Sequence, residues 1–285
     1  MSKLLFDVFS RHTKPSLEQL DQFISNSRQQ QTDVKSQGYY DRLQRASSWL
    51  AKAKRLHTDS EARYIFLWIA LNALYAIRPE VLDTPWWREE GELRPVMTKR
   101  QRDEKTQYEL EWFLWRACCL NVGEKVLKNV LENHLSDVDK LISNRYLMSK
   151  YWIWKSHIEE EFDEWKETGL TTVKYAISSL NDQKKMYRAL REIIIWRLRI
   201  LRNQLFHGCA TDTHSKRRAA GESELEAGSR ILEELIWAFL VLMASQSGQA
   251  RYWPPSPYPR AGSPQHKPFD PLGCQNDGWS SISHL

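Results

Sequence analysis

The stretch "LRNQLFHGCA" at residues 201–210 combines three side chains that can act on a phosphate ester. They are Arg202, Asn203 and His207, at the end of a long hydrophobic run. On an ideal helix Asn203 and His207 lie on one side, because they are four residues apart, whereas Arg202 and His207 are separated by about 140°. The Arg and the His can therefore converge only through a flexible long side chain, unwinding at Gly208, or a second copy of the chain.

This pair of residues suits the cleavage of RNA without a metal ion. A neutral imidazole, with an ordinary pKa of about 6.5, can take the proton from a ribose 2′-hydroxyl. A guanidinium can hold the phosphate and stabilise the extra negative charge of the transition state. The expected products are a 2′,3′-cyclic phosphate and a 5′-hydroxyl.

The spacing by itself is common, and an ordinary helix end competes with the catalytic interpretation. Arginine and histidine are favoured at helix C-termini by the helix dipole. However, no other motif offers better chemistry: HExxH, Gly-rich phosphate loops, GxSxG and plausible Cys/His metal clusters are absent from the sequence. We expect His134, Asp137 and Asp139 to be surface residues, and we predict neither a metal nor a cofactor.

Other polar residues are candidates for supporting roles. Asn72 lies in an otherwise apolar run, where it can support Arg202 or His207 or bond to a backbone carbonyl in the core. Basic residues near the motif are candidates for contact with an RNA backbone, although such charges often only face water. They are Lys184, Lys185, Arg188, Arg199, Lys216, Arg217 and Arg218.

A helix over 183–207 must position the motif. We expect it to be opened by Asn181 or Asp182 and closed by Gly208. Its apolar residues recur every three or four positions and predict a stripe that faces the core. The stripe consists of Leu190, Ile194, Leu198, Leu201 and Leu205.

Helical patterns also dominate the rest of the chain, whereas strand patterns are nearly absent. A helix is predicted over 58–78, with Thr58 as its N-cap and Pro79 as its stop, and its middle, 64–77, is apolar almost all round, which predicts a central position. A last helix is expected after Ser223, which has capping-box spacing to Glu226. A further helix over 16–31 is predicted to open at Ser16, after Pro15. The other predicted helices cover 38–56, 99–120, 122–134, 136–146, 148–167 and 170–180.

The bulk composition fits one globular domain with a tail. The chain has 285 residues and a net charge of +5, which permits a polyanionic partner without requiring one. Seven of the 11 prolines lie in 254–271. We therefore predict a single all-α domain over 1–247, with 99–180 as a candidate insertion, and a proline-rich tail over 248–285. The four cysteines form no disulfide framework, and we expect a soluble cytoplasmic protein without a membrane span.

Two stretches together resemble the HEPN domain family. "RNQLFHG" is similar to its R-x4-H signature, and "FLWIALNALYAI" at 66–77 is similar to its earlier central helix. The order of these helices also matches, with an amphipathic helix last. The resemblance covers about 38–77 and 183–247. The chain departs from one toxin subgroup of the family, because Cys209 stands where that subgroup has a tyrosine.

The resemblance implies an up-and-down helical bundle that forms a homodimer through the R-x4-H helices. It further implies a metal-independent endoribonuclease used as a toxin or in antiphage defence, with Arg202 and His207 as catalytic residues and Asn203 orienting them. An antitoxin or another regulatory protein is a further implied partner. The alternative is a catalytically inactive member that binds a protein or a nucleic acid.

Overall fold

The protein is described here by a computed structural model in which every regular element of the described residues is a helix. The predicted all-α fold is confirmed for these residues. Only the backbone is described at 34–37, 105–108 and 158–160. The described residues are 16–30, 34–76, 105–120, 122–148, 158–179, 182–206 and 222–245. The predicted proline-rich tail over 248–285 lies outside them.

Where the structure describes the connection between two helices, it is short. Two elements depart from α-helical geometry: the 3-10 helix η3 and the π-helix η4. The elements are α2 (Leu17–Gln29), α3 (Val34–Lys54), α4 (Ser60–Tyr75), α7 (Lys105–Cys119), α8 (Gly123–Asn133), α9 (Leu135–Ile142), η3 (Arg145–Leu147), α11 (Ile158–Ser178), α12 (Gln183–Leu190), η4 (Arg191–Leu198), α13 (Arg199–Phe206) and α14 (Glu222–Ser245).

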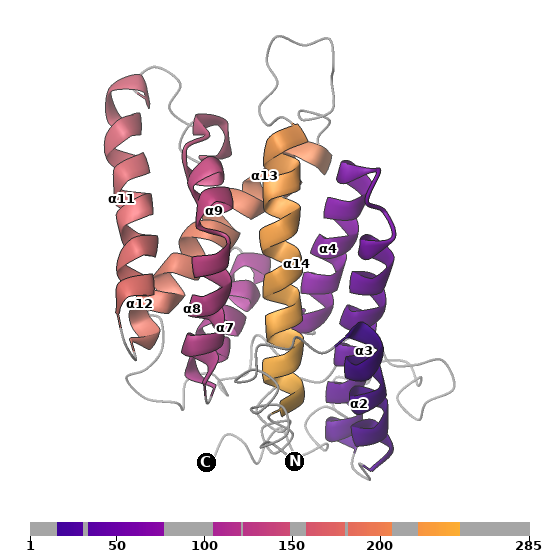
Figure 1. The fold of residues 1–285 in the computed structure, drawn as a ribbon. Helices are drawn as coiled ribbons and strands as arrows, with labels where there is room; N and C mark the ends of the chain where they lie inside the picture. Colours follow the sequence, from indigo (N-terminus) through magenta and orange to yellow (C-terminus); the bar gives the residue numbers. More distant parts are fainter. Residues whose placement is uncertain are drawn as a thin grey trace.

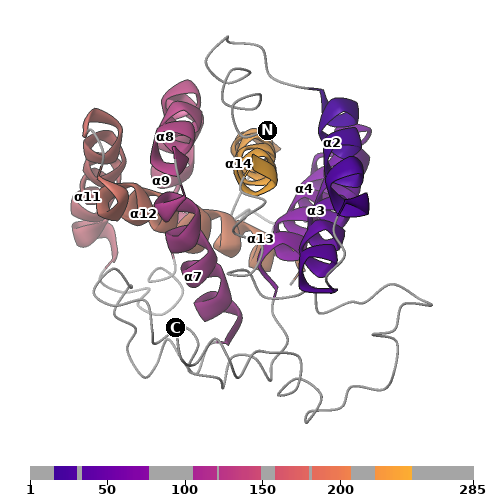
Figure 2. The same ribbon diagram turned by 90° about the horizontal axis from the view of Figure 1, so that it is seen from below.

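Helix α14 lies in the middle of the bundle. Helices α2, α3 and α4 pack on one side of it, and α8, α9 and α11 lie on the other (Figures 1 and 2). Every side chain from Leu235 to Ala244 is buried, so this helix is enclosed almost all round. The sequence-based prediction that helix 58–78 is central was wrong, because Ile65, Phe66 and Ile69 of α4 are only partly buried.

Two of the predicted helix starts are confirmed and two are wrong. Ser16 caps α2 with a capping box, and Asp182 caps α12 by accepting the Lys185 N–H. Thr58 does not cap α4, because the Asp59 carboxylate accepts the Ala62 N–H at 2.9 Å. The helix α14 begins at Glu222, so Ser223 lies in its first turn instead of at its N-cap.

Gly169 does not separate two helices as the sequence pattern predicted. The helix α11 continues through it from Ile158 to Ser178. A Cβ atom at this glycine would lie 3.0 Å from Glu192 Oε1 and 3.2 Å from Ile142 Cγ2. The glycine is therefore explained by the close approach of α11 to η4 and α9, and not by a turn.

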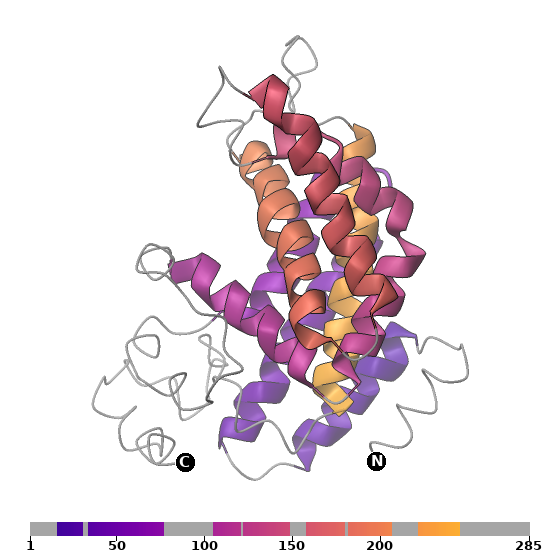
Figure 3. The ribbon, with the colours of Figure 1, turned by 90° about the vertical axis from the view of Figure 1, so that its left-hand side faces the viewer.

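The predicted helix over 183–207 forms one continuous rod, but its middle third is a π-helix. Figure 3 shows this rod beside α11. The Arg199 N–H donates to the carbonyl of Ile194, five residues earlier, as π geometry requires. The predicted apolar stripe is nevertheless buried along its whole length, from Leu190 at 0% exposure to Leu205 at 8%.

Candidate functional site

The start of α13 is tied to α4 and α14. The Tyr64 hydroxyl of α4 donates to the Leu198 carbonyl, at the end of η4, over 2.7 Å. On α14, a Cβ atom at Gly228 would lie 3.0 Å from Leu201 Cδ2 and 3.1 Å from Tyr64 Cε2. The three helices therefore approach one another closely here, and the glycine makes this approach possible.

The C-terminal end of α13 is tied to η3. The Gln204 amide is buried, with 5% of the residue exposed, and its Nε2 donates to the Tyr146 carbonyl over 2.6 Å. The guanidinium carbon of Arg145 lies 5.2 Å from the centre of the Tyr146 ring. Anchors near both ends fix the direction of α13 and therefore the place of Arg202.

Arg202 is held at the rim of the bundle by its neighbours on α13. Its Nη1 donates to Asn203 Oδ1 over 2.9 Å, and its guanidinium carbon lies 4.5 Å from the centre of the Phe206 ring. The Arg202 Nε is shielded from solvent and has no hydrogen-bond partner among the described residues. Phe206 itself is 55% exposed. One donor of the guanidinium thus remains without a partner beside an exposed aromatic ring.

Asn72 and Tyr75 of α4 form a hydrogen-bonded pair near this arginine. The Tyr75 hydroxyl donates to Asn72 Oδ1. Burial raises the pKa of Tyr75 well above its ordinary value, and the positive charge of Arg202 opposes the rise. Asn72 has no direct hydrogen bond to Arg202 among the described residues. The supporting role predicted for Asn72 therefore stays a prediction. Tyr75, which bonds to Asn72, is also close enough to Arg202 to be affected by its charge.

His207 directly follows the last residue of α13 and lies outside the described residues. The same holds for Gly208 and for the basic loop residues Lys216, Arg217 and Arg218. Their predicted roles therefore stay predictions. The structure brings together the described part of the motif, which is Arg202 and Asn203.

The other predicted RNA-contacting residues are spread along the rod. Arg199 lies one turn before Arg202 and is partly buried. Arg188 lies 14 positions before Arg202, on the order of 20 Å along the helix axis. Lys184 and Arg188 are exposed. Lys185 is engaged elsewhere: its Nζ pairs with Asp182 Oδ2 at 3.2 Å and lies 4.0 Å from the centre of the Tyr175 ring. These residues of α12 therefore do not gather around Arg202.

Sequence reasoning missed a buried arginine on α3. Arg42 is 1% exposed, and its Nη1 donates to the carbonyls of Leu74 and Ala76 at the C-terminal end of α4. Burial lowers the pKa of Arg42 to about 10, and the nearby carboxylate of Glu109 counteracts this effect. The pattern of apolar residues in 38–56 gave no signal for it, because the partners are carbonyls brought close only by the fold.

His134 and Asp137 lie together in an ion pair. The expected surface position of Asp137 was wrong, because this residue is buried. His134 Nδ1 lies 3.1 Å from Asp137 Oδ2, and Arg230 of α14 donates to both oxygens of the same carboxylate. Over the described ranges, no group of three or more His, Cys, Asp or Glu residues is arranged to hold a metal ion.

Comparisons of the chain with protein-family models, curated proteins and solved structures found no match. Among the described helices, none has the length and apolar character needed to cross a membrane. The site thus consists of the Arg202 guanidinium, held by Asn203 and by the exposed ring of Phe206, and His207 is the next residue in sequence after Phe206.

Proposed function

We propose that this protein is a HEPN-type, metal-independent endoribonuclease that acts as a toxin or an antiphage-defence effector. The observation that carries the proposal is the position of Arg202. Its guanidinium is oriented by Asn203 and Phe206 at the end of a well-anchored helix, and the residue is only partly buried. A guanidinium fixed in this way is ready to bind a phosphate without further ordering.

In the proposed reaction, His207 and Arg202 act on one phosphodiester of the RNA. The neutral imidazole takes the proton of the 2′-hydroxyl, and the 2′ oxygen attacks the phosphorus. The bond from the phosphorus to the 5′ oxygen breaks, and this oxygen takes a proton from water, while the imidazolium of His207 returns its proton to solvent. Arg202 stabilises the additional negative charge while both bonds are partly formed. The products are a 2′,3′-cyclic phosphate and a 5′-hydroxyl.

Phe206 extends the proposed site beyond the phosphate. Exposed aromatic rings bind single-stranded RNA by stacking on its bases. The ring of Phe206 is the more exposed neighbour of Arg202 on α13, so a base next to the bound phosphate can stack on it. A second copy of the chain, docked through α13, is the proposed homodimer partner and places two such sites side by side.

A second candidate function is supported by the same exposed ring. Phe206 and Arg202 can also form an anchor for a protein partner, because aromatic residues and arginine dominate binding energy at interfaces. The chain would then be a catalytically inactive binding module. Growth of the expressing cells distinguishes the two functions. A nuclease should slow growth, and the His207→Ala substitution should relieve this, whereas a binding module should affect growth equally with either residue.

A further inference from the structure

A pocket of about 280 Å³ lies between the first turns of α4 and α14. It has no role in the proposed cleavage of RNA. Its volume lies just under the range of roughly 300–1,000 Å³ that holds drug-sized ligands. Eight polar residues line it: His57, Thr58, Ser60, Arg63, Glu222, Glu226, Ser229 and Arg230.

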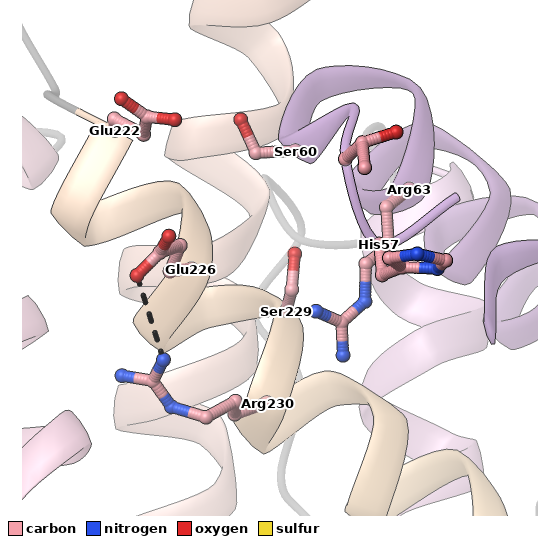
Figure 4. Close-up of a pocket in the computed structure, with 8 residues that line it drawn as sticks. His57, Ser60, Arg63, Glu222, Glu226, Ser229 and Arg230 are labelled. Carbon is pink, nitrogen blue, oxygen red and sulfur yellow. Dashed lines mark ion pairs between the residues drawn. The ribbon is translucent and has the colours of Figure 1, made fainter. Parts of the chain in front are cut away.

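Two buried polar atoms on its walls have no partner among the described residues. Ser229 is 1% exposed, and its hydroxyl makes no hydrogen bond. Figure 4 shows this hydroxyl pointing from α14 into the space between α14 and α4, with Ser60 and Arg63 across from it. The Arg63 Nε is likewise buried and without a partner. Buried polar groups nearly always have partners, and a molecule in the pocket would supply partners to both atoms at once.

The pocket is separate from the site on α13. Gly228 and Ser229 are consecutive on α14, so their side-chain directions differ by about 100°. Gly228 faces Leu201 and Tyr64, whereas Ser229 lines the pocket. The two sites therefore lie on different sides of α14.

The charges around the pocket do not favour a phosphate. Arg63 Nη2 pairs with Glu233 Oε2 at 2.7 Å, and Arg230 Nη2 pairs with Asp137 Oδ1 at 2.6 Å. Arg230 also pairs with Glu226 at 3.7 Å (Figure 4), and Glu233 is shared between Arg63 and Lys54. Both guanidinium charges are thus balanced by carboxylates, while Glu222 adds negative charge at the rim. An anion would meet no excess of positive charge here. The lining also contains no Phe, Tyr or Trp on which a nucleobase could stack.

We propose that this pocket binds a neutral polyhydroxylated molecule of the size of one monosaccharide. Each sugar hydroxyl both donates and accepts a hydrogen bond. Its oxygen can accept from the Arg63 Nε–H and from the Ser229 hydroxyl, and its proton can go to the carboxylates of Glu222 and Glu226. A ligand with neighbouring hydroxyls supplies partners to both walls at once, which neither a phosphate nor a cation does. The same chemistry is present in a free sugar and in the ribose of a nucleoside.

The test uses the full chain and saturation-transfer NMR with three probes: D-glucose, uridine and inorganic phosphate. We expect a signal for D-glucose, and a clearly stronger signal for the uridine ribose would identify a nucleoside as the source of the hydroxyls. The Ser229→Ala and Arg63→Lys variants should each weaken sugar binding by about fivefold, because each removes one hydrogen bond and Lys keeps the charge beside Glu233. Having two variants keeps the test valid if one of them fails to fold.

Ser47→Ala is the matched control. Ser47 of α3 is also buried, with 0% exposure and no partner for its hydroxyl among the described residues, but it does not line the pocket. Sugar binding should be unchanged in this variant. Binding that survives both pocket substitutions, or that is weakened equally by Ser47→Ala, would overturn the proposal. Binding of phosphate alone would overturn the class of ligand, and no binding of any probe would mean that the pocket holds only water.

Discussion

The hydroxyl of Tyr64 donates to the carbonyl of Leu198 over 2.7 Å, at the junction between η4 and α13. Arg202 lies one helical turn further along the same rod. This hydrogen bond is buried and joins residues 134 positions apart, so it links the placement of the arginine to the packing of α4. The orientation of the proposed catalytic guanidinium is thus set partly from a neighbouring helix.

The Tyr64→Phe substitution should therefore lower both stability and activity. Loss of the buried hydrogen bond should reduce the free energy of unfolding by about 1–2 kcal/mol, as measured by denaturant titration. A small shift of α13 should also reduce RNA cleavage by about tenfold or more, since catalysis is sensitive to such displacements.

Tyr39→Phe is the control for this prediction. The Tyr39 hydroxyl is also buried and donates to a backbone carbonyl, that of Met243, over 2.6 Å, but it joins α3 to the far end of α14. The Tyr39→Phe substitution should lower the free energy of unfolding by a similar amount and leave the rate of RNA cleavage unchanged. Equal loss of cleavage in both variants would show that activity follows global stability and not the position of α13.

Gly228→Ala should destabilise the protein by about 1 kcal/mol net. The added methyl would lie 3.0–3.2 Å from atoms of Leu201, Tyr64 and Leu198, and repacking of a tight core costs about 1–3 kcal/mol. The higher helix propensity of alanine offsets about 1 kcal/mol of this cost. Gly169→Ala should be better tolerated, because its nearest neighbour is the movable carboxylate of Glu192. Thermal unfolding of both variants tests this order of stability. A Gly228→Ala variant more stable than the Gly169→Ala variant would contradict it.

Phe206→Leu should weaken RNA binding in the inactive His207→Ala background. Loss of one stacked base costs about 1–3 kcal/mol, or about 5- to 150-fold in the dissociation constant. Tyr175→Leu is the matched control, because Tyr175 is 58% exposed and also contacts a cation, Lys185, but lies on α11. Fluorescence anisotropy with a labelled single-stranded RNA measures both. Equal effects of the two substitutions would argue against a specific role for Phe206.

The ion pair between Arg230 and Asp137 should stabilise the protein at neutral pH and not in acid. Burial favours the neutral carboxyl of Asp137, but hydrogen bonds from Arg230 and His134 outweigh it and hold the pKa below its ordinary value. The resulting stability is fully present above the unfolded-state pKa of about 4 and is lost as the pH falls through the folded-state value.

Unfolding of the wild type and of the Asp137→Asn variant at pH 7 and near pH 2 measures this effect. The variant should be less stable by about 1 kcal/mol at pH 7, in keeping with a partly exposed ion pair. The difference should shrink towards zero near pH 2, where both proteins carry a neutral side chain at this position. A difference that is the same at both pH values would contradict the assigned pKa direction.

Local patterns in the sequence predicted much of the fold. The apolar stripe from Leu190 to Leu205 and the caps at Ser16 and Asp182 are confirmed, because they depend on helix periodicity and on residues only a few positions apart. The central place of α14 was missed. Its stripe was visible, but burial of its remaining faces depends on helices from both halves of the chain.

The site was predictable only in part. The spacing of Arg202 and Asn203 placed both on one helix, and their hydrogen bond follows from that proximity. The π segment, the Tyr64 bond and the role of Gly169 all depend on contacts between distant segments, which a single sequence does not display. The pocket beside Ser229 was missed for the same reason, since its walls come from α4 and α14.

The most direct test of the central proposal is RNA cleavage by the purified full-length chain in excess EDTA, with identification of the product ends. The wild type should yield 2′,3′-cyclic phosphate ends. Arg202→Ala and His207→Ala should each reduce the rate by about 10²-fold or more, with unchanged helical circular dichroism. Cleavage that survives both substitutions, or that requires Mg²⁺, would contradict the proposal.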